Sequence, residues 1–227
     1  MWFIPPLLSA SARHWIIGDI HGCHQPLDRM LEALPCTDHL VFCGDVVGRG
    51  PDVPDVADQV WRLVKQSRAT WLMGNHEQRL LQDPALQLTV WSGDAALRRQ
   101  WHERLNTLPL WFQGNGWVAT HAGFDAEGRA DLHIREPFWT QYDGRYGRVV
   151  VAHTPGHEVR RKGAIVMIDT GAVYGGQLTA FCPETDAVVQ VQGLVESATM
   201  GSGSGPLNTM AIASSDPAEQ RVCDNPC

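Results

Sequence analysis

The chain has 227 residues, of which 44% are hydrophobic, and its formal net charge is −7 at pH 7. This length can bury the core of one sizeable domain, and an acidic balance argues against non-specific nucleic-acid binding, which needs a basic surface. No apolar run approaches the roughly 20 residues of a membrane-spanning helix, so we expect no membrane partner. With the charge, this leaves neither nucleic acid nor membrane as a partner, and the oligomeric state stays open. The cysteine pattern described below indicates a cytoplasmic protein.

Short apolar runs rich in β-forming residues alternate with amphipathic stretches along the first half of the chain. The runs predict strands over 14–17, 39–43, 69–73, 117–120, 149–152, 164–168, 178–182 and 187–191. Helical spacing of apolar residues predicts helices over 26–34, 56–64 and 95–105. Strand–helix alternation followed by strands alone predicts an α/β domain with two stacked sheets and helices outside them.

The two ends of the chain differ from this middle part. The first residues are apolar but lack the basic segment of a signal peptide, and 201–206 reads as a linker followed by polar, aperiodic sequence. We therefore predict a catalytic domain over 14–192, an N-terminal extension over 1–13 and a disordered tail over 193–227. The cysteines show no CxxC spacing, so reduced thiols are expected, although Cys223 and Cys227 could bind metal or cross-link.

Five short motifs place Asp, Asn or His beside glycine or at a strand exit. They are Gly18-Asp19-Ile20-His21-Gly22, Gly44-Asp45-Val46-Val47-Gly48-Arg49-Gly50, Gly74-Asn75-His76-Glu77, His121-Ala122-Gly123 and His153-Thr154-Pro155. Glycine lets the backbone turn sharply, and ligands of α/β sheets bind outside the carboxyl ends of the strands. We therefore expect the metal-binding side chains of all five motifs to converge on one rim.

The residue types in these motifs suit a pair of metal ions. Carboxylate and amide oxygens together with imidazole nitrogens favour divalent ions such as Mn, Fe or Zn. Asp45 lies in the middle of the set and could bridge both ions through its two oxygens. The expected ligands of one ion are Asp19 and His21, and those of the other are Asn75, His121 and His153. Two such ions lower the pKa of a bridging water and bind the oxygens of an in-line displacement.

The motif series GDIHG, GDVVGRG, GNHE, HAG and HTP resembles the phosphoprotein phosphatase family of calcineurin-like metallophosphoesterases, over about residues 14–192. It looks most like the small bacterial and lambda-phage type, and is also similar to symmetrical diadenosine tetraphosphate hydrolases. The resemblance implies a four-layer αββα fold of two mixed sheets flanked by helices. It also implies the ligand set above, Mn ahead of Fe, Zn, Ni or Co, and direct attack of a metal-bridging hydroxide on phosphorus.

The same resemblance implies roles for three residues around the metal ions. His76 would stand beside the phosphate and protonate the leaving group or stabilise developing charge. Arg49 matches the family's phosphate-binding arginine, and the segment 132–136 resembles the part that carries a second one, which puts Arg135 opposite Arg49. Two guanidinium groups on the phosphoryl oxygens suit phosphoryl transfer. The later stretch 168–172 is expected to act as structural support.

One departure from the family pattern concerns the leaving group. The family usually has Asp where this chain has Gly48, and that Asp orients the catalytic histidine. Without it His76 should be a weaker acid, unless Asp52 substitutes. Phosphoanhydrides and aryl esters leave more easily than a serine alkoxide, and symmetrical dinucleoside hydrolases tend to have a small residue at this position. Gly48 therefore favours a nucleotide substrate.

Two other features favour a phosphoprotein. The intervals from Asn75 to His121 and from His121 to His153 are compact, and His153-Thr154-Pro155 looks more like the protein phosphatase pattern. We therefore predict hydrolysis of phosphoserine, phosphothreonine or phosphotyrosine on proteins, with symmetrical dinucleoside polyphosphate hydrolysis as the alternative. An inactive phosphate-binding scaffold is a third, remote reading, because the whole ligand set is retained.

Residues outside the motifs could shape substrate recognition. Trp139 or Trp91 could stack on a base, and His157 with the basic segment 160–162 could form a basic lip, although a solvated hairpin turn is the simpler interpretation. Specificity is expected in the loops 83–94 and 125–132, because loops on a rigid scaffold commonly carry recognition.

Overall fold

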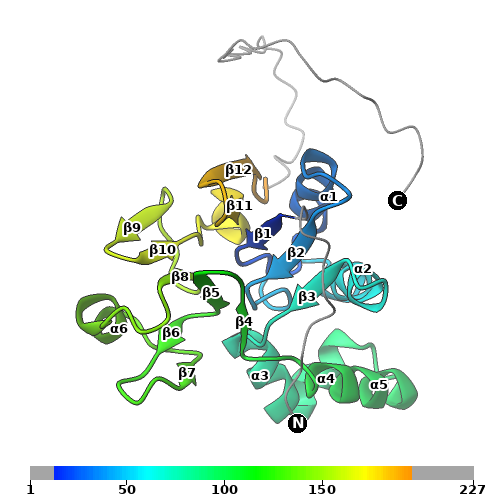
Figure 1. Ribbon diagram of the computed structural model, residues 1–227. Helices are drawn as coiled ribbons and strands as arrows, with labels where there is room; N and C mark the ends of the chain where they lie inside the picture. The colour runs from blue at the N-terminus through cyan, green and yellow to red at the C-terminus, as the bar shows by residue number, and fades with distance from the viewer. Residues whose placement is uncertain (1–12, 196–227) are drawn as a thin grey trace, which may run out of the picture. The chain divides into compact units, whose positions relative to one another are not determined.

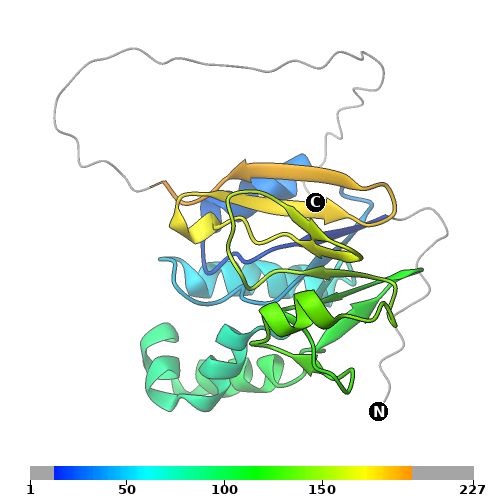
Figure 2. The same cartoon turned by 90° about the vertical axis from the view of Figure 1, so that its left-hand side faces the viewer.

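The computed structural model describes residues 13–195. Nearly all of the predicted N-terminal extension, and the predicted tail from residue 196 onward with Cys223 and Cys227, lie outside the described residues. Two five-stranded sheets form the centre of the described part, and helices pack on their outer faces (Figures 1 and 2). The predicted architecture of two stacked mixed sheets flanked by helices is therefore confirmed.

The first sheet has the strand order β12-β11-β1-β2-β3. Its strands are β1 (His14–Ile17), β2 (His39–Phe42), β3 (Ala69–Trp71), β11 (Gln177–Cys182) and β12 (Ala187–Gln192). β1, β2 and β3 are parallel, whereas β11 and β12 are antiparallel to their neighbours. The connections between the parallel strands contain α1 (His24–Ala33) and α2 (Val53–Lys65). These are βαβ units, which bring the carboxyl ends of β1, β2 and β3 to one edge.

The second sheet has the order β4-β5-β8-β10-β9 and is parallel in its middle. Its strands are β4 (Trp111–Gln113), β5 (Trp117–Thr120), β8 (Arg148–Val151), β9 (Arg160–Lys162) and β10 (Ile165–Met167). The remaining elements are α3 (Asn75–Gln82), α4 (Pro84–Val90), α5 (Ala95–Leu105), β6 (Gly123–Phe124), β7 (Ala130–Asp131), α6 (Glu136–Gln141) and the 3-10 turn η1 (Ala172–Tyr174).

Alternation along the strands builds a core on both faces of each sheet. In β1, Ile16 points into the layer between the sheets, whereas Trp15 and Ile17 pack toward the helices. In β8, Val150 faces the same inner layer and Val149 packs on the α6 side. Successive strand residues point to opposite faces, so strands buried on both sides read as continuous apolar runs. This is why these strands were visible in the sequence.

The eight predicted strands and three predicted helices all occur, with ends that differ by up to three residues. The sequence did not predict α3, α4, α6, β4, β6, β7, β9 or η1. The segment 83–94, expected as a loop, contains α4, because Asp83 accepts hydrogen bonds from the backbone N–H groups of Ala85 and Leu86 and Pro84 occupies the first helical position. The domain boundaries 14–192 stay a prediction.

Two further expectations concern membranes and thiols. None of the helices in residues 13–195 has the length and apolar character needed to cross a bilayer.

Within that range Cys23, Cys36, Cys43 and Cys182 are free thiols. Burial raises the pKa of Cys23 to about 11, so this thiol is unreactive at neutral pH.

Candidate metal centre

The polar residues of the five motifs meet at the carboxyl ends of five strands. They follow β1 (Asp19, His21), β2 (Asp45), β3 (Asn75), β5 (His121) and β8 (His153). The first four come from the first sheet and the two later histidines come from the second. Both carboxylates and all three imidazoles are buried between the sheets, with no more than 9% of any residue exposed. The expectation of one shared rim therefore agrees with the structure.

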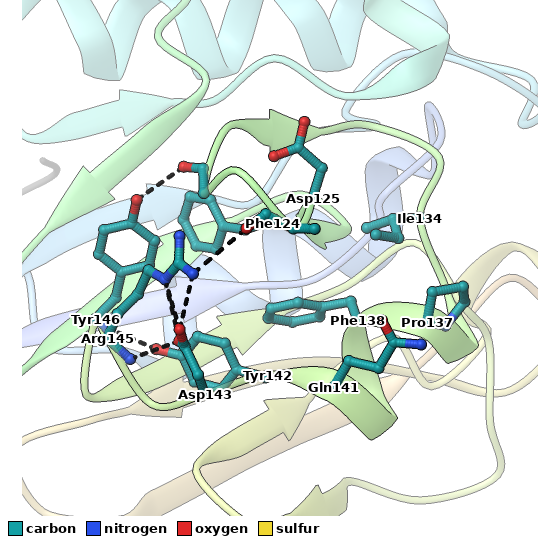
Figure 3. A pocket seen from close by; sticks show the side chains of 12 residues that line it. Phe124, Asp125, Ile134, Pro137, Phe138, Gln141, Tyr142, Asp143, Arg145 and Tyr146 are labelled. Atoms are coloured by element: carbon teal, nitrogen blue, oxygen red, sulfur yellow. Dashed lines mark hydrogen bonds and ion pairs between the residues drawn. The ribbon is translucent and has the colours of Figure 1, made fainter.

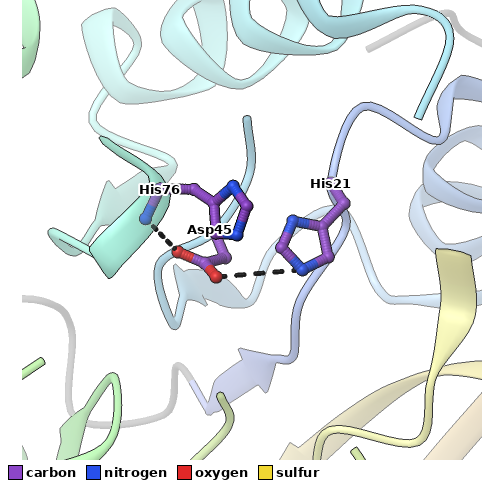
Figure 4. Close-up of side chains that lie close together, drawn as sticks. All are labelled: His21, Asp45 and His76. Carbon is purple, nitrogen blue, oxygen red and sulfur yellow. Dashed lines mark hydrogen bonds and ion pairs between the residues drawn. The ribbon is translucent and has the colours of Figure 1, made fainter. Parts of the chain in front are cut away.

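One group of donor atoms gathers around His21. Its Nε2 atom lies 3.6 Å from Oδ2 of Asp19 and 3.8 Å from Oδ2 of Asp45. The His21 backbone adopts a left-handed conformation with φ of 53°, as the tight turn after β1 requires. Figure 4 shows the Asp45 carboxylate between the His21 ring and the backbone N–H of His76, which donates to Oδ1 of Asp45 over 2.8 Å. Two carboxylates therefore face one imidazole nitrogen.

A second group gathers around His121. Its Nε2 atom lies 3.0 Å from Oδ1 of Asn75 and 3.1 Å from Nδ1 of His153, and these last two atoms are 2.9 Å apart. Oδ1 of Asp45 lies 3.5 Å from the same Nε2 atom. The two oxygens of Asp45 thus face different groups, Oδ2 toward His21 and Oδ1 toward His121.

Hydrogen bonds to backbone carbonyls set the orientation of two imidazole rings. Nδ1 of His121 lies 2.8 Å from the carbonyl oxygen of Cys43, and Nδ1 of His21 lies 3.3 Å from that of Val47. A ring that donates from Nδ1 keeps its lone pair on Nε2, the atom that faces the carboxylates in both cases. Both histidines therefore present the unprotonated nitrogen of a neutral ring to the donor cluster.

Burial opposes charge on every member of this cluster. It raises the pKa of Asp45 to about 7 and, together with the negative charges of Asp169 and Asp45, raises that of Asp19 well above its usual range. Burial also lowers the pKa of His21 to about 3 and that of His121 to about 4. A divalent cation binds neutral imidazoles and ionised carboxylates, and it would supply the positive counter-charge that these buried carboxylates lack. The donor set therefore fits divalent ions of the Mn, Fe or Zn type.

Glu77 is a supporting residue that the sequence analysis did not single out. Its side chain is fully buried and accepts hydrogen bonds from the backbone N–H groups of Asp45, Val47 and Gly74. Burial and the charge of Asp45 raise its pKa to about 8. Glu77 is the third residue of a helix that starts after Gly74, the capping-box position, so a capping signal was present in the sequence. It joins the turn after β2 to the start of α3.

Asp169 is a second residue whose position the sequence did not reveal. It is buried and accepts a hydrogen bond from the backbone N–H of Gly171. Burial raises its pKa, and its charge is the largest cause after burial that raises the pKa of Asp19. The stretch 168–172 was expected to be structural, and in addition it brings a third carboxylate close to the donor cluster.

His76 stands beside the first group without a hydrogen-bond partner for its ring among residues 13–195. The rings of His76 and His21 are 4.7 Å apart between centroids and meet edge to face. Burial lowers the pKa of His76 to about 4, with Arg49 as the next cause. His21, Asp45 and His76 also offer three donor atoms within 4.8 Å of one another, so His76 could be a ligand as well as an acid.

Gly48 explains why no carboxylate contacts this ring. Gly48 has a φ of +147°, and a Cβ atom there would contact Nδ1 of His21 and lie 3.0 Å from Nδ1 of His76. Any side chain at this position would therefore displace the His21 ring. Asp52, the suggested substitute, lies at the start of α2 and forms no hydrogen bond or ion pair with His76 in the described part of the chain. Among residues 13–195, no carboxylate forms a hydrogen bond with the His76 ring in place of the usual aspartate.

The two candidate phosphate-binding arginines lie on different sides of the donor cluster. Arg49 and Arg135 are both exposed. After burial and His76, Arg49 helps to lower the pKa of His21. After burial and His121, Arg135 helps to lower the pKa of His153 to about 3. The charge of Arg49 therefore acts on His21 of the first group, and the charge of Arg135 acts on His153 of the second.

The suggested recognition residues have other roles. Trp91 is 2% exposed and stacks on Trp101 at 4.8 Å, so it is a core residue and the idea that it stacks on a base is wrong. Trp139 stays half-buried, with the Arg160 guanidinium 6.0 Å from its ring. The basic segment 160–162 forms strand β9, which pairs antiparallel with β10 as one arm of a hairpin, as the simpler interpretation expected, and Arg160 donates to the carbonyl oxygen of Thr154.

An aromatic pocket of about 250 Å³ lies beside the 125–132 segment, separate from the donor cluster (Figure 3). Phe124, Phe138, Tyr142 and Tyr146 line it, and an ion pair between Arg145 and Asp143 lies at its edge.

The comparisons with known proteins agree with this geometry. Residues 12–190 match the family model of the calcineurin-like phosphoesterases. The chain is 33% identical over 199 residues to serine/threonine-protein phosphatase 1 of Salmonella typhimurium, covering 74% of this chain and 90% of that protein. It is 29% identical over 224 residues to the asymmetrical bis(5'-nucleosyl)-tetraphosphatase PrpE of Anoxybacillus flavithermus, covering 76% of this chain and 91% of that protein.

Comparison with solved structures supports the same fold. A protein serine/threonine phosphatase structure from Saccharomyces cerevisiae superposes with a TM-score of 0.60 at 13% identity, covering 85% of this chain and 83% of that chain. The family uses divalent metal ions, and the chain retains the donor groups described above. The chain therefore belongs to the calcineurin-like metallophosphoesterase family and is a hydrolase of that family.

Proposed function

We propose that this chain hydrolyses phosphate compounds with two divalent metal ions, Mn being the expected ion. The observation that carries the proposal is the position of Asp45, whose two carboxylate oxygens face different donor groups. Its Oδ2 lies 3.8 Å from Nε2 of His21, whereas its Oδ1 lies 3.5 Å from Nε2 of His121. The ligands of the two ions would be Asp19, His21 and Asp45 on one side and Asp45, Asn75, His121 and His153 on the other. Such ions lower the pKa of a bound water and neutralise phosphate oxygens.

The residues around the donor cluster would bind and orient the phosphate. Arg49 and Arg135, approaching from two sides, would hold phosphate oxygens through charge-assisted hydrogen bonds. His76 would lie beside the leaving group. The His76 ring packs edge to face on His21 and has no hydrogen-bond partner within residues 13–195 that would orient it as an acid, so we expect it to be an inefficient proton donor. The site should therefore prefer leaving groups that depart without a proton.

This preference favours a phosphoanhydride over a serine phosphate. A departing phosphate is already a stable anion, whereas a serine alkoxide needs a proton. The similarity to a bis(5'-nucleosyl)-tetraphosphatase supports the same choice. We therefore place dinucleoside polyphosphates first among the substrate classes, which reverses the order that the motif spacing suggested.

Phosphoproteins remain the second candidate. The compact intervals between Asn75, His121 and His153 support it, as does the similarity to a serine/threonine-protein phosphatase. Protein substrates would also suit the exposed position of both arginines.

Side-by-side turnover in Mn²⁺ of diadenosine tetraphosphate and a phosphothreonine peptide tests the proposal. A higher kcat/KM for the dinucleotide supports the first candidate, and the products then give the cleavage position. ADP alone means symmetrical cleavage, whereas ATP with AMP means asymmetrical cleavage. A higher value for the peptide supports the second candidate. Absence of metal-dependent hydrolysis of either compound and of 4-nitrophenyl phosphate would contradict the proposal and favour a binding scaffold.

A further inference from the structure

A pocket of about 150 Å³ is lined by Gly48 and His76, and by none of the residues of the second donor group. Its floor is apolar and includes Val53 and Leu80. Gly48 lies against the His76 ring within this lining, because a Cβ atom there would be 3.0 Å from Nδ1 of His76. The pocket therefore adjoins the position proposed for the leaving group.

Two guanidinium groups border this pocket without a negative partner. Arg49 and Arg79 both line it and are both exposed. Neither side chain forms an ion pair or a hydrogen bond within residues 13–195, and Arg49 has only the Tyr174 ring beside it, 5.9 Å from its guanidinium carbon. Arg79 follows His76 by three residues on α3, so the two side chains share one face of the helix. An unpaired positive charge at this position attracts an anion.

The proposed function uses Arg49 on the transferred phosphate and leaves Arg79 without a role. We propose that Arg79 and the mouth of this pocket bind the phosphate next to the scissile one. The substrate class is then a phosphoanhydride, either a nucleoside polyphosphate or an inorganic polyphosphate. This inference rests on the proposed function, because it takes the leaving group to lie on the His76 side of the centre.

The reaction balances without a proton from His76. The oxygen of a water molecule forms a bond to the scissile phosphorus, and the bridging P–O bond breaks. The electron pair of that bond stays on the oxygen of the departing phosphate, and the proton of the water goes to solvent. The departing phosphate gains negative charge as the bond breaks, so a guanidinium at its oxygens stabilises the transition state more than the ground state. Arg79 would thus stabilise the charge on the leaving group of an anhydride, whereas the leaving group of an ester needs a proton from an acid.

The variant Arg79→Gln tests this inference, since glutamine keeps the helix propensity and removes the charge. The measurement is kcat/KM in Mn²⁺ for inorganic tripolyphosphate and for 4-nitrophenyl phosphate, whose leaving group carries no second phosphate. A hydrogen bond to a charged group contributes about 1.5–3 kcal/mol, so the ratio of the two values should fall by about tenfold or more. Arg99→Gln, at an exposed position on α5, is the matched control and should leave the ratio unchanged.

Binding to the metal-free protein provides a readout that does not depend on turnover. By calorimetry, Arg79→Gln should weaken binding of tripolyphosphate about tenfold relative to binding of orthophosphate, and Arg79→Lys should recover part of the loss. Equal weakening of both anions, or no weakening of either, would overturn the inference. If the wild-type protein turned over neither substrate, the proposed function would fail, and the binding ratio would still decide the role of Arg79.

Discussion

The donor cluster and the arginines around it differ in burial and in the number of contacts that fix their side chains. His121 is fully buried and its Nδ1 is bonded to the carbonyl oxygen of Cys43. Arg49, Arg79 and Arg135 are exposed and have no ion-pair partner within residues 13–195. The chain has thus preorganised its metal ligands, whereas its phosphate-binding side chains must lose conformational freedom when substrate binds. Changes to the first region should alter metal content, and changes to the second should alter substrate binding alone.

The largest effect is expected from Asp45→Asn. The amide removes charge from the residue that faces both donor groups, so metal content and turnover should fall together. The loss should exceed the roughly 100-fold that removal of an outer hydrogen-bond partner costs at a metal site. Elemental analysis and turnover in Mn²⁺ measure it, and Asp55→Asn at an exposed position of α2 is the control. Full metal content with near-normal turnover would show that Asp45 is not a bridging ligand.

The variant His76→Gln separates an acid from a ligand. General acid catalysis contributes about 10²–10⁴-fold, and we expect the low end because no carboxylate orients the ring. The loss should approach about 100-fold on a phosphothreonine peptide and stay below about tenfold on 4-nitrophenyl phosphate. Metal content should not change. A loss of metal together with an equal loss on both substrates would instead make His76 a ligand.

A smaller and more selective effect is expected from Arg135→Ala. The side chain is exposed, so the fold and the metal content should be unaffected. Loss of a charge-assisted hydrogen bond to phosphate should lower kcat/KM by about 10- to 100-fold. Steady-state kinetics and inhibition by orthophosphate measure the change, with Arg99→Ala as the control. A drop in metal content would place Arg135 in the first region rather than the second.

The smallest effect is a pH dependence of stability in the metal-free protein. Burial raises the pKa of Asp45 to about 7 and that of Glu77 to about 8, both above their unfolded values. The folded state then binds more protons than the unfolded state near neutral pH, so stability falls as the pH rises through 7 to 8. The lowered pKa values of His21 and His153 act in the opposite sense, but only below their ordinary value of 6.5.

Thermal melts in a chelator should therefore show Tm falling between about pH 6.5 and 8.5. Saturating Mn²⁺ should reduce this fall, because the cation supplies the missing positive charge. The same slope with and without metal would show that the buried carboxylates are not the cause.

The sequence predicted the parts of this molecule that depend on local chemistry. Strands buried on both faces read as continuous apolar runs, and metal-binding residue types at strand exits indicated one convergent site. The sheet-edge strand β9 was missed because its residues, Arg160 to Lys162, are charged and at least partly exposed. The short helix α6 was missed because six residues give too little periodicity.

The remaining features of the site depend on tertiary contacts that no local pattern encodes. The role of Glu77 requires three N–H groups from two separate turns to meet one carboxylate. The proximity of Asp169 to Asp19 arises because segments far apart in sequence end at the same edge. The crowding of Gly48 against two imidazoles is visible only once both rings are placed.

The origin of the donors from both sheets has a consequence for metal retention. Asp19, His21, Asp45 and Asn75 follow strands of the first sheet, whereas His121 and His153 follow strands of the second. An ion held by the second donor group would act as a cross-link between the sheets. It would join Asn75 to His153, which are 78 positions apart in the chain. Its dissociation and the separation of the two sheets then become coupled events. The residence time of the metal would therefore report how rarely this interface opens, much as slow amide exchange reports rare opening of a protein core.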